Sequence, residues 1–106
     1  MPTLNTLRAS LTVALDNVDR MVDERQPHRT IGRMSAVIEA DRALAVAHRD
    51  AASAAFDLAS ELTKRGNQQA ATQTLILYGY HDRLATVTQE YADARAAKLD
   101  AVGGAL

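Results

Sequence analysis

Apolar residues recur every three or four positions along most of the chain, which is the period of an amphipathic α-helix. The first run has alternating spacings of three and four, the a/d pattern of a heptad, and comprises Leu4, Leu7, Leu11, Ala14, Val18 and Met21. Thr3 precedes this run as a residue type that caps helix N-termini, and Pro27 follows it as a residue that interrupts helices. The pattern therefore predicts a first helix over about residues 3–25.

Two longer helices are predicted on either side of a short turn. Arg65-Gly66-Asn67 combines a glycine, which suits the left-handed position after a helix, with an asparagine, which suits the next N-cap. The helical period covers about residues 30–64 before this turn and about residues 67–102 after it. Gly32 lies in the first turn of the earlier helix, so an alternative start is near Ser35. We expect Gly103 and Gly104 to end the last helix and leave a short C-terminal tail.

The predicted contact faces of these two helices mix apolar and polar residues. In the earlier helix the face comprises Met34, Val37 or Ile38, Asp41, Leu44, His48, Ala51, Ala55, Leu58 and Leu62. In the later helix it comprises Ala70, Thr74, Leu77, Tyr80 or His81, Leu84, Val87, Tyr91, Ala94 and Lys98 or Leu99. A short turn makes the helices antiparallel neighbours, so residues whose numbers sum to about 133 should meet. This register places Asp41 opposite Tyr91 and Ala92, and predicts a hydrogen bond from Tyr91 to Asp41. It places His48 opposite Leu84 and Ala85.

The elements together predict an all-α fold in one domain over residues 1–106: a long antiparallel helical hairpin plus a shorter N-terminal amphipathic helix. That first helix either folds back to complete a three-helix bundle or pairs with another copy in a coiled-coil oligomer. The chain has 3 Tyr, 1 Phe and no Trp, and many of its apolar residues are alanine, so one copy buries little large apolar surface. We therefore expect a homo-oligomer or another protein partner. The expected interface comprises Leu4, Leu7, Leu11, Val18, Met21, Tyr78 and Tyr80.

Composition excludes several classes of function. Twelve basic and thirteen acidic residues give a net charge of -1, which argues against a nucleic-acid partner because phosphate binding needs a basic excess. The absence of cysteine excludes disulfides and cysteine-ligated metal sites. No apolar run is long enough to span a membrane, and the N-terminus lacks signal-peptide features, so we expect a cytoplasmic location, or a virion if the gene is phage-borne. The alanine- and arginine-rich composition favours a bacterial or phage origin.

A basic cluster surrounds the predicted break between the first two helices. It comprises Arg25, His28, Arg29 and Arg33, with no acidic residue between Glu24 and Glu39. Helix N-termini bind anions, so an alternative function is an anion- or nucleic-acid-binding adaptor that uses Arg25, Arg29 and Arg33.

A second alternative is a small enzyme or RNA-acting domain that uses Arg42, His48 and Asp41. The spacing from Arg42 to His48 resembles the arginine–histidine motif of HEPN ribonucleases, although Ala43 stands where that motif has a polar residue. Asp41 and His48 are about two helical turns apart, too far to chelate one metal as adjacent ligands of one helix.

No nucleophile–base pair, metal cluster or phosphate-binding loop follows from the spacing, so we expect no catalytic residue, metal or cofactor. The sequence favours a non-enzymatic helical assembly or interaction module, a structural subunit of a larger bacterial or phage complex that self-associates or docks a partner through amphipathic helix faces.

Overall fold

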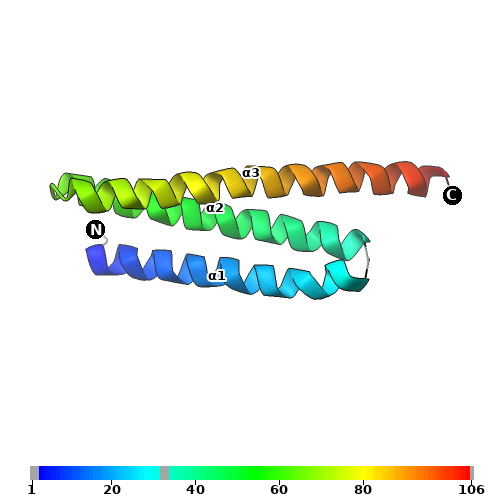
Figure 1. The fold of residues 1–106 in the computed structure, drawn as a ribbon, viewed down its shortest axis with the longest axis horizontal. Helices are drawn as coiled ribbons and strands as arrows, with labels where there is room; N and C mark the ends of the chain where they lie inside the picture. The colour runs from blue at the N-terminus through cyan, green and yellow to red at the C-terminus, as the bar shows by residue number, and fades with distance from the viewer. Residues whose placement is uncertain (1–2, 32–33, 106) are drawn as a thin grey trace.

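The computed structural model describes residues 3–31 and 34–105, with side chains for 3–24 and 34–102. Within these residues the chain forms three helices: α1 (Leu4–Ile31), α2 (Met34–Lys64) and α3 (Gln68–Ala105). They lie side by side in an elongated molecule of 60 × 22 × 20 Å, and α3 runs antiparallel to α2 (Figure 1). The predicted all-α hairpin is confirmed. None of the described helices is both long and apolar enough to cross a membrane.

Local hydrogen bonds explain two of the helix ends. At the start of α1, the Thr3 hydroxyl accepts a hydrogen bond from the backbone N–H of Thr6 at 3.1 Å, as expected of an N-cap. At the end of α2, Gly66 has a φ of 81°, and the N–H of Asn67 donates to the Leu62 carbonyl at 2.9 Å. This is a Schellman motif. The side chain of Asn67 then accepts a hydrogen bond from the N–H of Ala70 at 3.2 Å and caps α3.

Two predicted helix ends are wrong. Helix α1 continues through Pro27 to Ile31, and α3 continues through Gly103 and Gly104 to Ala105. Proline fixes φ near a helical value and removes one hydrogen-bond donor, so a helix can pass it at a cost of about 3 kcal/mol. Glycine costs only about 1 kcal/mol in a helix. Residues 32 and 33 lie outside the described part of the chain, and α2 begins at Met34, which agrees with the later of the two predicted starts, near Ser35.

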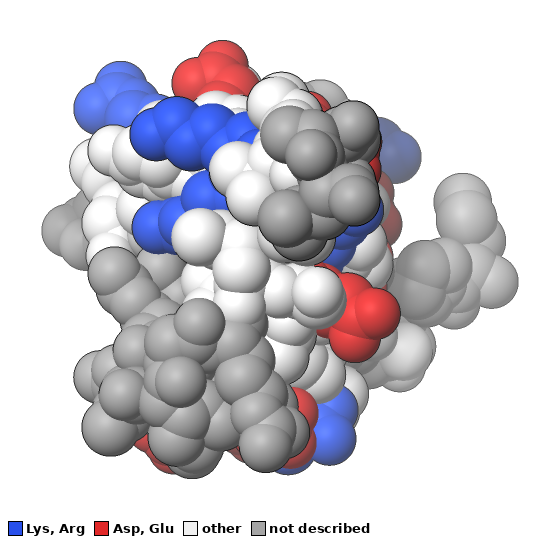
Figure 2. Space-filling model, turned by 90° about the vertical axis from the view of Figure 1, so that its right-hand side faces the viewer, with Lys and Arg blue, Asp and Glu red and all other residues white. Residues whose placement is uncertain are grey.

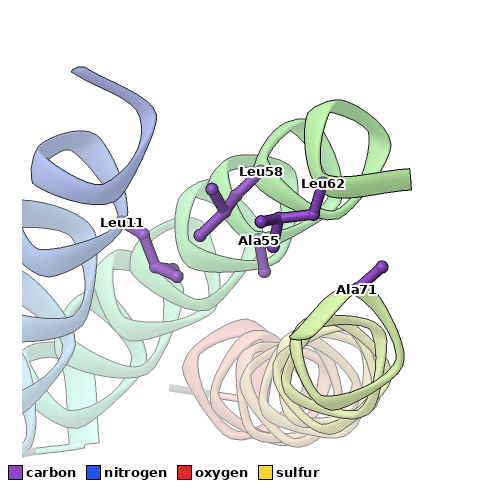
Figure 3. Packing of buried hydrophobic residues seen from close by; sticks show 5 residues of the cluster. All are labelled: Leu11, Ala55, Leu58, Leu62 and Ala71. Atoms are coloured by element: carbon purple, nitrogen blue, oxygen red, sulfur yellow. The ribbon is translucent and has the colours of Figure 1, made fainter. Parts of the chain in front are cut away.

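Helix α2 is the centre of the molecule. Both α1 and α3 pack along it, while no described Cα atom of α1 lies within 8 Å of one in α3. The first helix therefore folds back on its own hairpin. Its Leu11 and the α2 residue Leu58 extend into the space between their helices, and Ala71 joins the same apolar cluster from α3 (Figure 3). A second cluster joins Val18 of α1 to Leu44 and two alanines of α2.

Helix α3 contacts α2 with the predicted face only in part. Ala70, Leu77 and His81 pack against the core or against α2, as predicted, but toward the C-terminus the contact shifts to neighbouring positions. The buried apolar residues of α3 are all small: Ala71, Ala85 and Ala92. Small side chains let the two backbones approach closely, and this advantage outweighs the larger apolar area of the predicted stripe. The predicted residues Tyr80, Val87 and Tyr91 consequently remain exposed on α3.

Candidate functional site

An apolar stripe of exposed and half-buried residues runs along α3 beside the face that packs on α2. We call it the α3 stripe, and it comprises Leu77, Tyr80, Leu84, Val87, Tyr91 and Ala94. Tyr80 is 60 % exposed, Tyr91 59 % and Val87 37 %. The spacings alternate between three and four, so α3 carries a second heptad seam besides the one that packs on α2. This seam spans about 25 Å at the rise of an α-helix.

One edge of the α3 stripe borders an open groove between α1 and α3. The groove has a volume of about 500 Å³ and takes Tyr80, Leu84 and Thr88 from α3. Apolar side chains of α1 form the facing wall, namely Leu15, Val18 and Val22. The apolar surface beside α3 is therefore wider than the stripe alone, because the described backbones of α1 and α3 do not approach one another closely.

Two histidines from different helices meet at the bottom of the groove. The Nδ1 atoms of His48 on α2 and His81 on α3 lie 2.8 Å apart, and each residue is only 5 % exposed. One ring must donate through Nδ1–H while the other accepts. Burial lowers the pKa of His81, and the negative charge of Asp19 on α1 partly offsets that effect. The rings of Tyr80 and His81 lie nearly perpendicular to each other, with centroids 5.1 Å apart.

A buried ion pair lies farther along the same helix interface. The carboxylate of Asp41 is fully buried and accepts a hydrogen bond from the guanidinium of Arg95, whose side chain is 28 % exposed. The same guanidinium lies 5.7 Å from the centroid of the Tyr91 ring. We predicted a hydrogen bond from Tyr91 to Asp41, but in the structure Arg95 donates to this carboxylate. The Tyr91 ring packs on the guanidinium of Arg95 instead.

The three residues of the enzyme alternative do not converge. Arg42 points to the surface, where it pairs with Asp93 at 3.6 Å. Asp41 faces Arg95, and His48 faces His81 in a separate groove. Among the residues that the structure describes, no group of three or more histidine or acidic side chains has the geometry of a metal site.

The residues predicted as a partner interface divide into two groups, the apolar seam of α1 and two tyrosines of α3. Leu11 and Val18 are buried against α2, and the flanking seam residues Leu4, Leu7 and Met21 pack half-buried on the same clusters. A contact of this seam with another chain stays a prediction for a state in which α1 has left the hairpin.

The two predicted tyrosines differ from one another. Tyr78 is half-buried and packs on Phe56 of α2, with ring centroids 5.5 Å apart. Tyr80 is exposed and belongs to the α3 stripe. Only Tyr80 is therefore available to another chain in this conformation.

The predicted anion site cannot be located, because the side chains of Arg25, His28, Arg29 and Arg33 lie outside the described residues. The end of the molecule near that break carries both basic and acidic side chains on its described surface (Figure 2).

Sequence reasoning missed His81 as the partner of His48 and Arg95 as the partner of Asp41. The antiparallel register contained the signal, because both partners lie within one helical turn of the predicted opposite positions. The chain matches no protein-family model, and neither a curated protein nor a solved structure matches it significantly.

Proposed function

We propose that the protein is a non-enzymatic helical interaction module that binds another protein chain through the α3 stripe. The carrying observation is that α3 has two heptad seams, and that the large side chains Tyr80, Val87 and Tyr91 of the second seam stay exposed within the chain. Folding needs the seam that packs on α2, and it gains little from the large side chains of Tyr80, Val87 and Tyr91, which lie about 100° around the helix from that seam and stay exposed. A regular exposed apolar stripe of this kind is typical of a helix that packs on a partner helix.

The polar groups inside the molecule support a structural role. Asp41 engages Arg95, and His48 engages His81, so both contacts join polar side chains across the α2–α3 interface. Such buried polar pairs often fix the register of a helical hairpin. In this proposal the molecule is a structural subunit of a larger bacterial or phage assembly, located in the cytoplasm or, for a phage protein, in the virion.

The three tyrosines allow a direct test by hydroxyl-radical footprinting. Tyr80 and Tyr91 should be reactive in the dilute purified protein and protected inside the cells that naturally produce it. Tyr78 is an internal control, because it is half-buried within the chain and its reactivity should be equal in both samples. Equal reactivity of Tyr80 and Tyr91 in cells and in dilute solution would overturn the proposal.

A further inference from the structure

The charges beside the α3 stripe indicate which chain it binds. On its outer flank lies a second row of residues at heptad spacing, namely Ile76, Arg83, Glu90 and Ala97. The sequence of this row is apolar, basic, acidic, apolar. A row of this composition is complementary to its own reverse, because reversal brings the basic residue opposite the acidic one and the two apolar residues opposite each other.

Resting on the proposed function, we propose that the partner is a second copy of this chain, bound antiparallel along α3 about a two-fold axis between Leu84 and Val87. In this register Leu84 of each copy packs on Val87 of the other, and Tyr80 packs on Tyr91. On the flank, Arg83 of each copy lies opposite Glu90 of the other, and Ile76 lies opposite Ala97. A two-fold axis makes every contact occur twice, as in most homodimers.

The charges of Arg83 and Glu90 are available for this contact. Both side chains are exposed, and neither has an ion-pair partner among the residues that the structure describes. Across the dimer they would form two equivalent ion pairs at the edge of an apolar seam, where charges select the partner and its orientation.

A parallel pairing of the two α3 helices fits less well. In a parallel coiled coil each residue of the outer flank lies opposite the residue five positions later in the partner. Arg83 would then face Thr88, which is buried. Glu90 would face Arg95, which already binds Asp41 within its own chain. The antiparallel register uses the free charges and leaves the internal pairs intact.

The expected association is weak and depends on concentration. The contact involves one helix from each copy over about 25 Å, which places its buried area at the low end for specific interfaces. Light scattering should therefore show a mass that rises from one copy to two as the protein concentration increases. If the Val87→Glu variant forms dimers at the same concentrations as the natural chain, the α3 stripe is not the contact surface.

Engineered disulfides test the register, and the natural chain has no cysteine to interfere. A mixture of Tyr80→Cys and isotope-labelled Tyr91→Cys chains should form a mixed disulfide, identified by its mass. Tyr80→Cys alone should form none, because antiparallel helices place its two copies about 16 Å apart along the axis, beyond disulfide reach. A disulfide between two Tyr80→Cys chains would show a parallel pairing and overturn the inference.

Charge exchange tests the flank independently. Arg83→Glu places an acidic side chain opposite Glu90 of the second copy and should weaken association about tenfold. Adding Glu90→Arg should restore the original affinity. Arg49→Glu makes the same change of charge on the exposed surface of α2 and should have no effect. A double variant as weak as the single one would exclude this contact.

The two proposals fail in different ways. A protein that stays monomeric at all concentrations and forms no mixed disulfide contradicts the homodimer. If Tyr80 and Tyr91 are nevertheless protected in cells, the α3 stripe binds a different protein and the proposed function stands. If they are not protected, both proposals are wrong.

Discussion

The imidazole Nδ1 atoms of His48 and His81 lie 2.8 Å apart in a buried contact between α2 and α3. Two neutral rings satisfy this contact, since one donates and the other accepts. Two fully protonated rings cannot, because each would then direct an N–H and a positive charge at the other. The contact therefore makes the hairpin sensitive to acid.

Stability should fall as the pH decreases below the ordinary histidine value. Burial lowers the pKa of His81 below 6.5, so the unfolded chain takes up a proton that the folded chain resists. The histidine contribution is fully present above pH 6.5 and is lost progressively below it. Denaturant unfolding at about pH 7.5 and about pH 5 measures the difference, in a range where most carboxylates stay charged.

Asp19 provides a matched variant for this measurement. Its charge raises the pKa of His81, so Asp19→Asn should lower that pKa further and enlarge the loss of stability at acidic pH. His81→Gln should reduce the pH dependence, because an amide does not titrate. A stability that stays constant between the two pH values would contradict this account of the histidine pair.

The ion pair of Asp41 and Arg95 should contribute more to the free energy of unfolding than the exposed pair of Arg42 and Asp93, although both pairs connect α2 to α3. Arg95→Met leaves a fully buried carboxylate without this partner and should lower the free energy of unfolding by about 3 kcal/mol. Arg42→Met removes a pair whose side chains are 50 % and 59 % exposed, and should change it by less than about 1 kcal/mol. If the two variants lose the same free energy of unfolding, burial does not determine how much each ion pair contributes to stability.

Two glycines should respond to alanine with opposite signs. Gly66 has a φ of 81°, which a side chain disfavours, so Gly66→Ala should lower stability by about 1 kcal/mol. Gly79 lies within α3, and a Cβ added there meets no atom within 4 Å. Gly79→Ala should therefore raise stability by about 1 kcal/mol. Thermal unfolding followed by circular dichroism measures both, and a loss in Gly79→Ala would reveal a contact on that side of α3.

Acidic substitutions on α1 test whether its seam packs within the chain. Leu11 is 8 % exposed and Val13 is 68 % exposed. Leu11→Asp buries an unpaired charge and should lower the free energy of unfolding by about 3 kcal/mol or more, with loss of amide protection throughout α1. Val13→Asp should change it by less than about 0.5 kcal/mol. Hydrogen exchange that is the same in both variants would mean that α1 does not rest on α2 through Leu11.

The sequence predicted the hairpin well because its turn carries strong local signals. Gly66 and Asn67 each have a conformational preference that does not depend on the rest of the fold, and the antiparallel register follows from the length of the turn. The end of α1 was predicted less well. Pro27 disfavours a helix locally, yet the helical backbone continues past it to Ile31, and residue types alone do not show whether the rest of α1 offsets that penalty.

The contact face of α3 was predicted only in part, for a different reason. The helix has two faces at heptad spacing, one of large residues such as Leu84 and one of small residues such as Ala85. A rule based on side-chain hydrophobicity selects the large residues. The alanine face allows closer approach to α2 and brings His81 to His48 and Arg95 to Asp41, and only the three-dimensional arrangement reveals those polar contacts.

The central position of α2 also determines how the chain folds. The close backbone approaches in the described residues join consecutive helices, α1 to α2 and α2 to α3. No step requires the two ends of the chain to find one another first, so the loop-closure entropy of each step is small. A helical topology with such low contact order is expected to fold within milliseconds, and the hairpin of α2 and α3 can form before α1 docks.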